Sequence, residues 1–220
     1  FTVGFQIAET VKRHRKEVNN DQAWKRAVEM LDLVRISDAK RRAKNYPHEF
    51  SGGMRQRVMI AIALACNPQL LIADEPTTAL DVTIQAQVLE LMSGLSKEFS
   101  TAVMLITHDL GVVAGTCQHV NVMYAGHIVE SAPVKQIFET PAHPYTVGLL
   151  RSIPRLDEKR GSHLTPIAGQ PPDLSREIVG CPYAPRCPKV QSRCREERPK
   201  LMPVGLSLIH ISEPTRQAEI

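Results

Sequence analysis

The chain has 220 residues, with 43% hydrophobic and 23% charged residues, which is typical of a soluble globular protein with room for one substantial domain and an appendage. The formal net charge of +4 is too small to indicate a nucleic-acid-binding protein by itself. No apolar run is long enough to cross a bilayer, and no signal-peptide pattern is present. We therefore expect a cytoplasmic location.

The first fifty residues are predicted to be helical and basic. Apolar residues recur at mixed helical spacing, and eleven Lys or Arg residues lie between Lys12 and Lys44. A solvated helix face explains this charge most simply. The alternative is a surface that lies near a membrane or an acidic partner.

A glycine pair marks the next helix. Ser51 is a plausible N-cap, Gly52 and Gly53 follow it, and the helix is expected to run from about Met54 to Cys66, where Asn-Pro ends it. Glycines allow a backbone to approach a ligand closely. A helix N-terminus also presents free N–H groups and positive dipole charge, which suits a phosphate.

Two carboxylates follow a short apolar run at residues 70–73, which predicts a strand buried on both faces. Asp74 at the strand end would hold Mg²⁺ through water, and Glu75 could act as general base for a water that attacks a phosphate. An isolated Asp-Glu pair is usually a surface pair. Here the apolar run before it and Pro76 after it favour a site.

A second apolar strand is predicted at residues 102–106, after a helix that Asp81 caps and that runs to about Phe99. His108 follows this strand, so we expect it at the same sheet edge as the carboxylates, in reach of a terminal phosphate. Two short strands, 120–124 and 127–129, come next and are expected to turn at Ala125-Gly126. The alternation of strands and helices predicts a parallel, helix-covered sheet.

In this order and spacing, these motifs resemble the ATP-binding-cassette (ABC) ATPases: a signature loop, a Mg²⁺ strand and a switch histidine. The segment 79–81 resembles the loop that this family uses across its dimer interface. The resemblance implies an α/β P-loop NTPase fold of the ABC type, with ATP and Mg²⁺ as cofactors. It assigns catalysis to Glu75 and His108, the metal to Asp74, and nucleotide contacts to Ser51, Gly52, Gly53, Met54, Gln56 and Asp81.

In that family, two nucleotide-binding domains close around two ATP molecules. The resemblance implies that Ser51 and Gly53 act on ATP bound by the other subunit. The phosphate-binding pattern G-x-x-x-x-G-K-[ST] is absent from residues 1–220, and the first residue is Phe. We therefore expect a fragment that is truncated before the Q-loop. Gln6 is not expected to be the family's Mg²⁺-sensing glutamine. Alone, it should neither bind ATP tightly nor hydrolyse it.

Further motifs are similar to the dipeptide and oligopeptide importer branch. They are Phe-Ser-Gly-Gly-Met at residues 50–54, His-Pro-Tyr-Thr at 143–146, and a C-x5-C-x6-C cluster. Some members of this branch bind a [4Fe–4S] cluster through four cysteines. The candidate ligands here are Cys181, Cys187 and Cys194, and no fourth Cys follows them.

The resemblance divides the chain into four parts. These are a helical subdomain remnant at 1–52, the C-terminal part of the ATPase core at 53–150, an oligopeptide-transporter C-terminal extension at 151–204, and a tail at 205–220. The tail is unlike the family and is expected to be non-native, so the expected fold does not include it.

The leading hypothesis is the ATPase subunit of a di- or oligopeptide importer. Its implied partners are membrane permease subunits, a second ATP-binding subunit and, indirectly, a periplasmic or extracellular peptide-binding protein. It would lie peripherally on the cytoplasmic face of the membrane and bind no nucleic acid. The alternatives are a related importer for nickel or another small solute, a soluble ABC ATPase acting on nucleic acid or ribosomes, and an iron–sulfur module.

Overall fold

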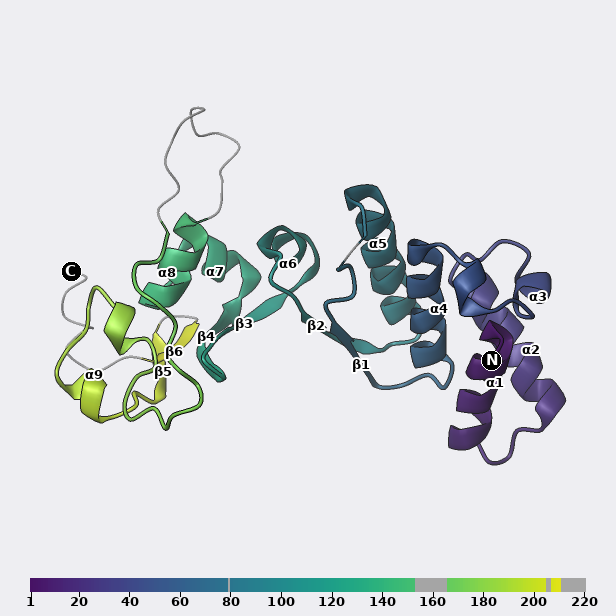
Figure 1. The fold of residues 1–220 in the computed structure, drawn as a ribbon, viewed down its shortest axis with the longest axis horizontal. Helices are drawn as coiled ribbons and strands as arrows, with labels where there is room; N and C mark the ends of the chain where they lie inside the picture. Colours follow the sequence, from purple (N-terminus) through teal and green to yellow (C-terminus); the bar gives the residue numbers. More distant parts are fainter. Residues whose placement is uncertain (79, 153–165, 205–206, 211–220) are drawn as a thin grey trace. The chain divides into compact units, whose positions relative to one another are not determined.

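The computed structural model describes residues 1–78, 80–152, 166–204 and 207–210. The chain splits into two compact units, Phe1–Leu110 and Gly111–Ile220, and each is described by itself (Figure 1). This division falls inside the expected 53–150 segment. The four-part division of the chain stays a prediction.

The first unit begins with helices, as its apolar spacing predicts. Thr2 caps α1, and Asn19 caps α2 through a capping box with Gln22, in which each side chain accepts the other's backbone N–H. The helices and strands of this unit are α1 (Val3–His14), α2 (Asn20–Leu33), α3 (Ala39–Arg42), η1 (Pro47–Glu49), α4 (Gly52–Leu64), β1 (Leu70–Asp74), α5 (Val82–Glu98) and β2 (Ala102–Ile106).

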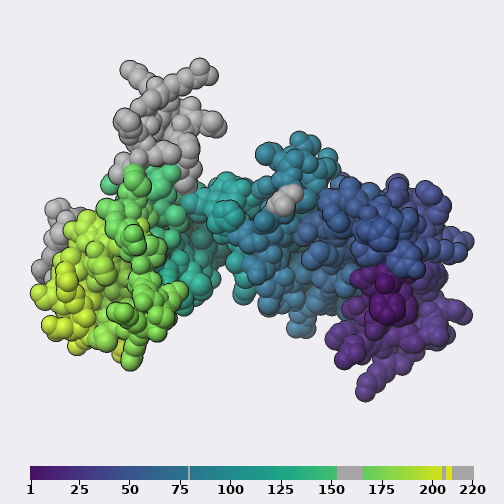
Figure 2. Space-filling model, viewed as in Figure 1, coloured from purple at the N-terminus to yellow at the C-terminus, as the bar shows by residue number. Residues whose placement is uncertain are grey.

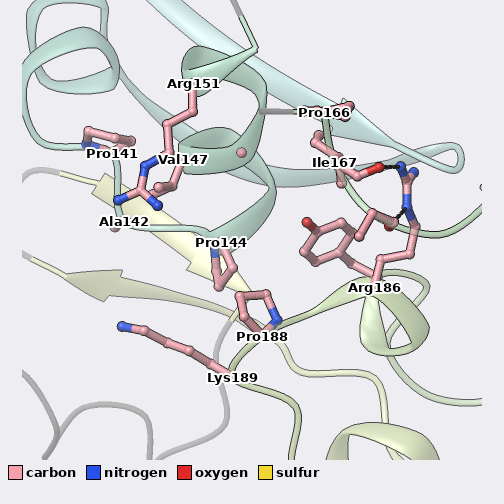
Figure 3. Close-up of a pocket in the computed structure, with 13 residues that line it drawn as sticks. Pro141, Ala142, Pro144, Val147, Arg151, Pro166, Ile167, Arg186, Pro188 and Lys189 are labelled. Atoms are coloured by element: carbon pink, nitrogen blue, oxygen red, sulfur yellow. Dashed lines mark hydrogen bonds between the residues drawn. The ribbon is translucent and has the colours of Figure 1, made fainter. Parts of the chain in front are cut away.

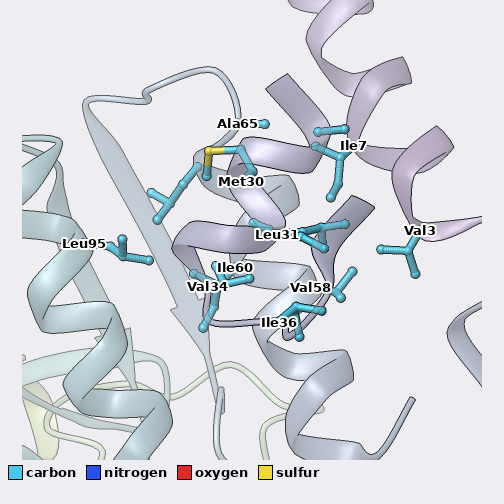
Figure 4. Packing of buried hydrophobic residues seen from close by; sticks show 14 of the residues in the cluster. Val3, Ile7, Met30, Leu31, Val34, Ile36, Val58, Ile60, Ala65 and Leu95 are labelled. Atoms are coloured by element: carbon cyan, nitrogen blue, oxygen red, sulfur yellow. The ribbon is translucent and has the colours of Figure 1, made fainter. Parts of the chain in front are cut away.

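One hydrophobic core joins these elements (Figure 4). Side chains of α1, α2, α4 and α5 contribute to it, and the helices before β1 form a continuous mass, purple to blue in Figure 2. Ile7 and Leu31 are fully buried at its centre. Burying a side chain of this size stabilises the fold by roughly 1.5–3 kcal/mol.

The chain just after α4 has one residue in the left-handed backbone conformation, and two arginines donate hydrogen bonds to its carbonyls. Asn67 has φ of 52°, which is a common way to end a helix. Arg26 Nε donates to the carbonyl of Ala65 (3.2 Å), and Arg15 donates to that of Cys66 (3.2 Å). The predicted stop at Asn-Pro is therefore confirmed, and α4 itself runs from Gly52 to Leu64.

The sheet of the first unit pairs β1 with β2 in parallel, in a register that sets Asp74 opposite Ile106. Both strands are confirmed, but burial on both faces is wrong for the described chain. Leu71 packs into the core beneath α4 and α5, whereas Ile72 and Met104 on the opposite face are 59% and 50% exposed. The described helices cover one face only, so alternate residues of β1 stay in solvent.

The second unit is built on an antiparallel sheet of four strands in the order β3-β4-β6-β5. The expected turn between β3 and β4 is confirmed and makes them antiparallel, so the expected parallel pairing is confirmed for β1 and β2 and is wrong for this sheet. Ala125 and Gly126 form that turn, both with positive φ. The helices and strands of the second unit are β3 (His119–Tyr124), β4 (His127–Pro133), α7 (Val134–Glu139), α8 (Pro144–Arg151), η2 (Ala184–Arg186), α9 (Arg193–Glu196), β5 (Leu201–Val204) and β6 (Ser207–His210), together with most of α6 (Leu110–Thr116).

Strand β6 falls in the segment that was expected to lie outside the fold. Within the described residues, Ile209 pairs with Glu130 and Leu208 with Ser131, so residues 207–210 extend the sheet beside β4. Their exclusion from the fold was therefore wrong. Residues 205–206 and 211–220 lie outside the described residues, and the non-native origin of the tail stays a prediction.

Candidate functional site

Glu75 directly follows β1, and its backbone takes a left-handed conformation with φ of 45°. Its N–H donates to the carbonyl of Ile106 at 2.9 Å, which fixes it to the end of β2. The hydroxyl of Thr78 donates to Glu75 Oε2 at 3.0 Å. The positive φ of a non-glycine residue is strained, and such residues cluster at functional sites.

His108 meets this carboxylate. Its Nδ1 lies 2.7 Å from Glu75 Oε1, a hydrogen-bonded ion pair when the imidazole is protonated. The parallel register explains the contact, since Asp74 and Ile106 lie opposite each other and strands β1 and β2 end at the same edge of the sheet. The expected placement of Glu75 and His108 together is confirmed. The side chain of His108 remains 83% exposed, and that of Glu75 is 38% exposed.

The pair shifts both pKa values. The hydrogen bond from His108, with a smaller contribution from Thr78, lowers the pKa of Glu75 below its usual value. The hydrogen bond and the charge of Glu75 raise the pKa of His108. The pair therefore favours the anion of Glu75, and it favours the protonated form of His108 more than in a free histidine.

Asp74, the predicted Mg²⁺ residue, ends β1 as an exposed side chain. Across the residues that the structure describes, no group of three His, Cys, Asp or Glu side chains is arranged to hold a metal ion. A Mg²⁺ ion that keeps several waters and binds phosphate oxygens needs only one or two protein carboxylates. Asp74 suits that mode, and its role stays a prediction.

The glycine pair begins α4, and Ser51 is its N-cap, as predicted. Ser51 Oγ accepts the N–H of Met54 at 3.4 Å. A Cβ atom on Gly53 would lie 2.5 Å from Cγ2 of Ile84, so glycine is required where α4 approaches α5. Gly52 is less crowded, with Leu80 Cδ2 at 3.7 Å from such an atom.

The other residues that are predicted to contact nucleotide differ in how far they are buried. Asp81 is exposed and caps α5, accepting the N–H of Ile84 at 3.0 Å, which confirms the predicted cap. Met54 is half-buried and packs against the core, while Gln56 is half-buried on α4. Ala79, within the predicted interface loop, lies outside the described residues.

A contact that the sequence does not predict links α5 to the loop that carries His108. Gln85 Nε2 donates to Asp109 Oδ2 at 3.1 Å, one residue after His108. A glutamine in the first turn of a helix has no specific sequence signal. Together with the packing of Gly53 on Ile84, this bond connects the start of α4, the start of α5 and the His108 loop.

The three candidate cluster cysteines gather in the second unit. The N–H of Cys181 donates to the carbonyl of Cys194 at 2.8 Å. Burial raises the pKa of the Cys181 and Cys187 thiols, and neighbouring thiols raise both pKa values further. These groups favour the thiol form, whereas metal ligation needs thiolates. No described trio of ligating side chains fits a metal here either.

Two family models match the chain. Residues 2–78 match "ABC transporter", and residues 129–194 match "Oligopeptide/dipeptide transporter, C-terminal region". A "Probable peptide ABC transporter ATP-binding protein y4tR" of Sinorhizobium fredii is 59% identical over 91% of this chain. "Oligopeptide transport ATP-binding protein OppD" of Escherichia coli is 53% identical over 90% of this chain.

The chain belongs to the ATP-binding proteins of ABC transporters. It spans 59% of the length of y4tR and 58% of that of Escherichia coli OppD. Among solved structures, the dimeric ATP-binding cassette MJ0796 bound to ADP and Pi is similar to this ABC protein, with a TM-score of 0.52 and 29% identity. That match covers 61% of this chain and 57% of MJ0796.

A putative metal-chelate type ABC transporter in an inward-facing conformation shares the fold, with a TM-score of 0.58 at 23% identity, over 68% of this chain and 57% of its own. The ABC-type α/β fold expected from the motifs is therefore confirmed. In the described part of this ABC protein, no helix combines the length and apolar character of a membrane span.

Proposed function

We propose that this chain is part of the ATP-hydrolysing subunit of an ABC importer for di- or oligopeptides. The contact between Glu75 and His108 at the ends of neighbouring parallel strands carries the assignment of an ATPase site. The names of the relatives, among them OppD and y4tR, support the peptide class of the solute.

In the proposed mechanism, Glu75 is the general base for the attacking water. Its bond from Thr78 holds Oε2, and its bond with His108 keeps the carboxylate charged before ATP binds. A protonated His108 that turns to the γ-phosphate would release Glu75 Oε1. The freed carboxylate then has a higher pKa and is the stronger base when water attacks.

Asp74 would hold Mg²⁺ through water, from the exposed end of β1. When bound there, the ion would supply positive charge that stabilises the negative charge developing on the phosphate. Ser51 and Gly53 at the N-terminus of α4 would contact ATP bound by a second ATP-binding subunit, because α4 has 13 residues and the free N–H groups at its start attract phosphate. Asp81, in the loop proposed to lie at the dimer interface, is the further proposed nucleotide contact.

The intact protein would lie on the cytoplasmic face of the membrane, bound to permease subunits that receive peptide from a binding protein. The proposal includes no iron–sulfur cluster, because burial raises the pKa of the Cys181 and Cys187 thiols and no fourth Cys follows Cys194 in residues 195–220. Residues 1–220 contain no phosphate-binding loop motif, so this chain alone should not turn over ATP.

The test is reconstitution of the intact protein with its permease subunits in vesicles. ATP turnover should rise when a peptide-loaded binding protein is added, and labelled peptide should enter the vesicles. Turnover that responds to nickel or another solute and not to peptide would overturn the peptide assignment. Turnover that responds to nucleic acid in the absence of permease would overturn the importer assignment.

A further inference from the structure

The second unit contains a cavity of about 470 Å³ between α8 and the loop that follows η2 (Figure 3). Its volume lies in the range of ordinary ligand pockets. Four prolines, four aliphatic residues and a tyrosine make most of its wall. The lining residues are Pro141, Ala142, Pro144, Val147, Gly148, Arg151, Pro166, Ile167, Ala168, Tyr183, Arg186, Pro188 and Lys189.

A buried carboxylate holds one wall in place. Glu130 on β4 is fully buried, and its two oxygens accept the backbone N–H groups of Ala142 at 2.8 Å and His143 at 3.0 Å. The turn that carries Pro141 and Pro144 is thereby tied to the sheet. A polar side chain removed from water is tolerated when it is hydrogen-bonded in this way.

Arg186 holds the opposite wall. It donates from Nε to the carbonyl of Ala168 and from a terminal nitrogen to that of Ile167, both at 2.9 Å. Its other terminal nitrogen donates to the hydroxyl of Tyr124 at 3.3 Å. Figure 3 shows the guanidinium turned to these carbonyls. This wall is therefore fixed before any ligand arrives.

Gly148 brings α8 close to this wall. A Cβ atom at that position would lie 3.1 Å from Cγ1 of Ile167 and 3.7 Å from the hydroxyl of Tyr183. Tyr183 is itself buried and packs edge-on against Tyr124, with ring centroids 5.2 Å apart. The floor of the cavity is apolar and closely packed.

The charged side chains that line this cavity, called the groove below, are all positive. Three lining residues are cations and none is an acid. Arg186 donates hydrogen bonds within its wall. Arg151 and Lys189 are exposed and lie on the other side of the cavity in Figure 3. Within residues 1–78, 80–152, 166–204 and 207–210, no ion pair is formed by Arg151. Such a groove attracts an anion whose body is apolar.

We propose that this groove binds a segment of a partner protein in which an apolar side chain stands next to carboxylates. Four of the wall residues are prolines, which have no N–H to donate, so strand addition is not the mode of binding. The apolar side chain would pack between the proline turn and Ile167. The carboxylates would meet Arg151 and Lys189. This site is separate from the ATPase residues and does not depend on them.

The 220-residue chain is titrated with a fluorescently labelled, end-blocked peptide of sequence Glu-Leu-Asp-Leu-Glu-Val, followed by anisotropy. The expected result is saturable binding that weakens as salt rises, because the contacts are charged. Replacing both Arg151→Ala and Lys189→Ala should weaken binding roughly tenfold, or about threefold for each cation. The matched control, Arg195→Ala with Lys200→Ala on exposed positions outside the groove, should bind like the parent chain.

A second variant tests the apolar half of the site. Val147→Asp places a carboxylate in the groove from a half-buried position and should abolish binding, while circular dichroism confirms that α8 remains folded. The proposal is overturned if the amide analogue Gln-Leu-Asn-Leu-Gln-Val binds equally well, if inorganic phosphate displaces the peptide, or if only peptides with free termini bind. Equal affinity of the double variant and its control would also overturn it.

Discussion

Oε1 of Glu75 and Nδ1 of His108 lie 2.7 Å apart, although the two residues are 33 positions apart in the chain. The parallel pairing of β1 and β2 creates this contact, because both strands end at the same edge. The geometry also fixes the electrostatics. Each residue holds the other in its charged form, and the exposed position of His108 leaves it accessible to a ligand.

The first prediction concerns the titration of His108 by NMR. Its pKa should lie above the ordinary value of about 6.5. Glu75→Gln should bring the pKa back toward that value, because the bond to Glu75 is the main cause of the shift. Asp109→Asn is the control and should lower the pKa less, since the charge of Asp109 is the smallest cause. Equal effects of the two substitutions would contradict the pairing.

The same pair has a pH window. The raised pKa of His108 means that its stabilising effect is present below pH 6.5 and is lost as pH rises through the raised value. The lowered pKa of Glu75 means that its effect is present above pH 4.5 and is lost as pH falls through the lowered value. Chemical shifts of the loop after β1 should therefore be constant between these limits and change outside them. A change centred inside this window would count against the ion pair.

A second prediction concerns the glycine at the start of α4. Gly53→Ala places a methyl group 2.5 Å from Ile84 Cγ2 and should lower the free energy of unfolding by about 1–3 kcal/mol, measured by urea denaturation. The matched control is Gly94→Ala in α5, where no atom lies within 4 Å of the added methyl group. That change should stabilise the chain by about 0.5–1 kcal/mol. Adding Ile84→Ala should recover part of the Gly53→Ala loss only if the contact causes it.

A third prediction concerns the buried carboxylate of the second unit. Glu130→Gln replaces one acceptor with an NH2 group that faces a backbone N–H, and should lower the free energy of unfolding by about 1–3 kcal/mol. Glu139→Gln, on an exposed position nearby, should change it little. Equal denaturation midpoints for the two variants would show that Glu130 does not hold the turn before α8.

Short-range signals in the sequence predicted much of the site. Caps at Ser51 and Asp81, the two apolar runs and the residues that follow them placed Glu75 and His108 together, because a cap or a strand end is decided by neighbouring residues. Burial of the strands could not be predicted this way. Whether Ile72 is covered depends on which elements pack on the sheet, and the described helices pack on one face.

Contacts between distant parts of the chain were also missed. The bond between Gln85 and Asp109 and the packing of Gly53 on Ile84 depend on how α4, α5 and the histidine loop meet. The sheet pairing of residues 207–210 depends on the edge that β4 offers. None of these follows from periodicity or turn chemistry, since each is a tertiary contact.

The most direct test of the proposed ATPase site is Glu75→Gln in the intact protein, with ATP turnover measured beside a control, Glu90→Gln, on an exposed position of α5. Loss of the general base should reduce turnover by about 10²–10⁴-fold and leave ATP bound in a closed dimer, while the control turns over normally. If turnover of the Glu75→Gln protein stays within about tenfold of the parent, Glu75 is not the general base.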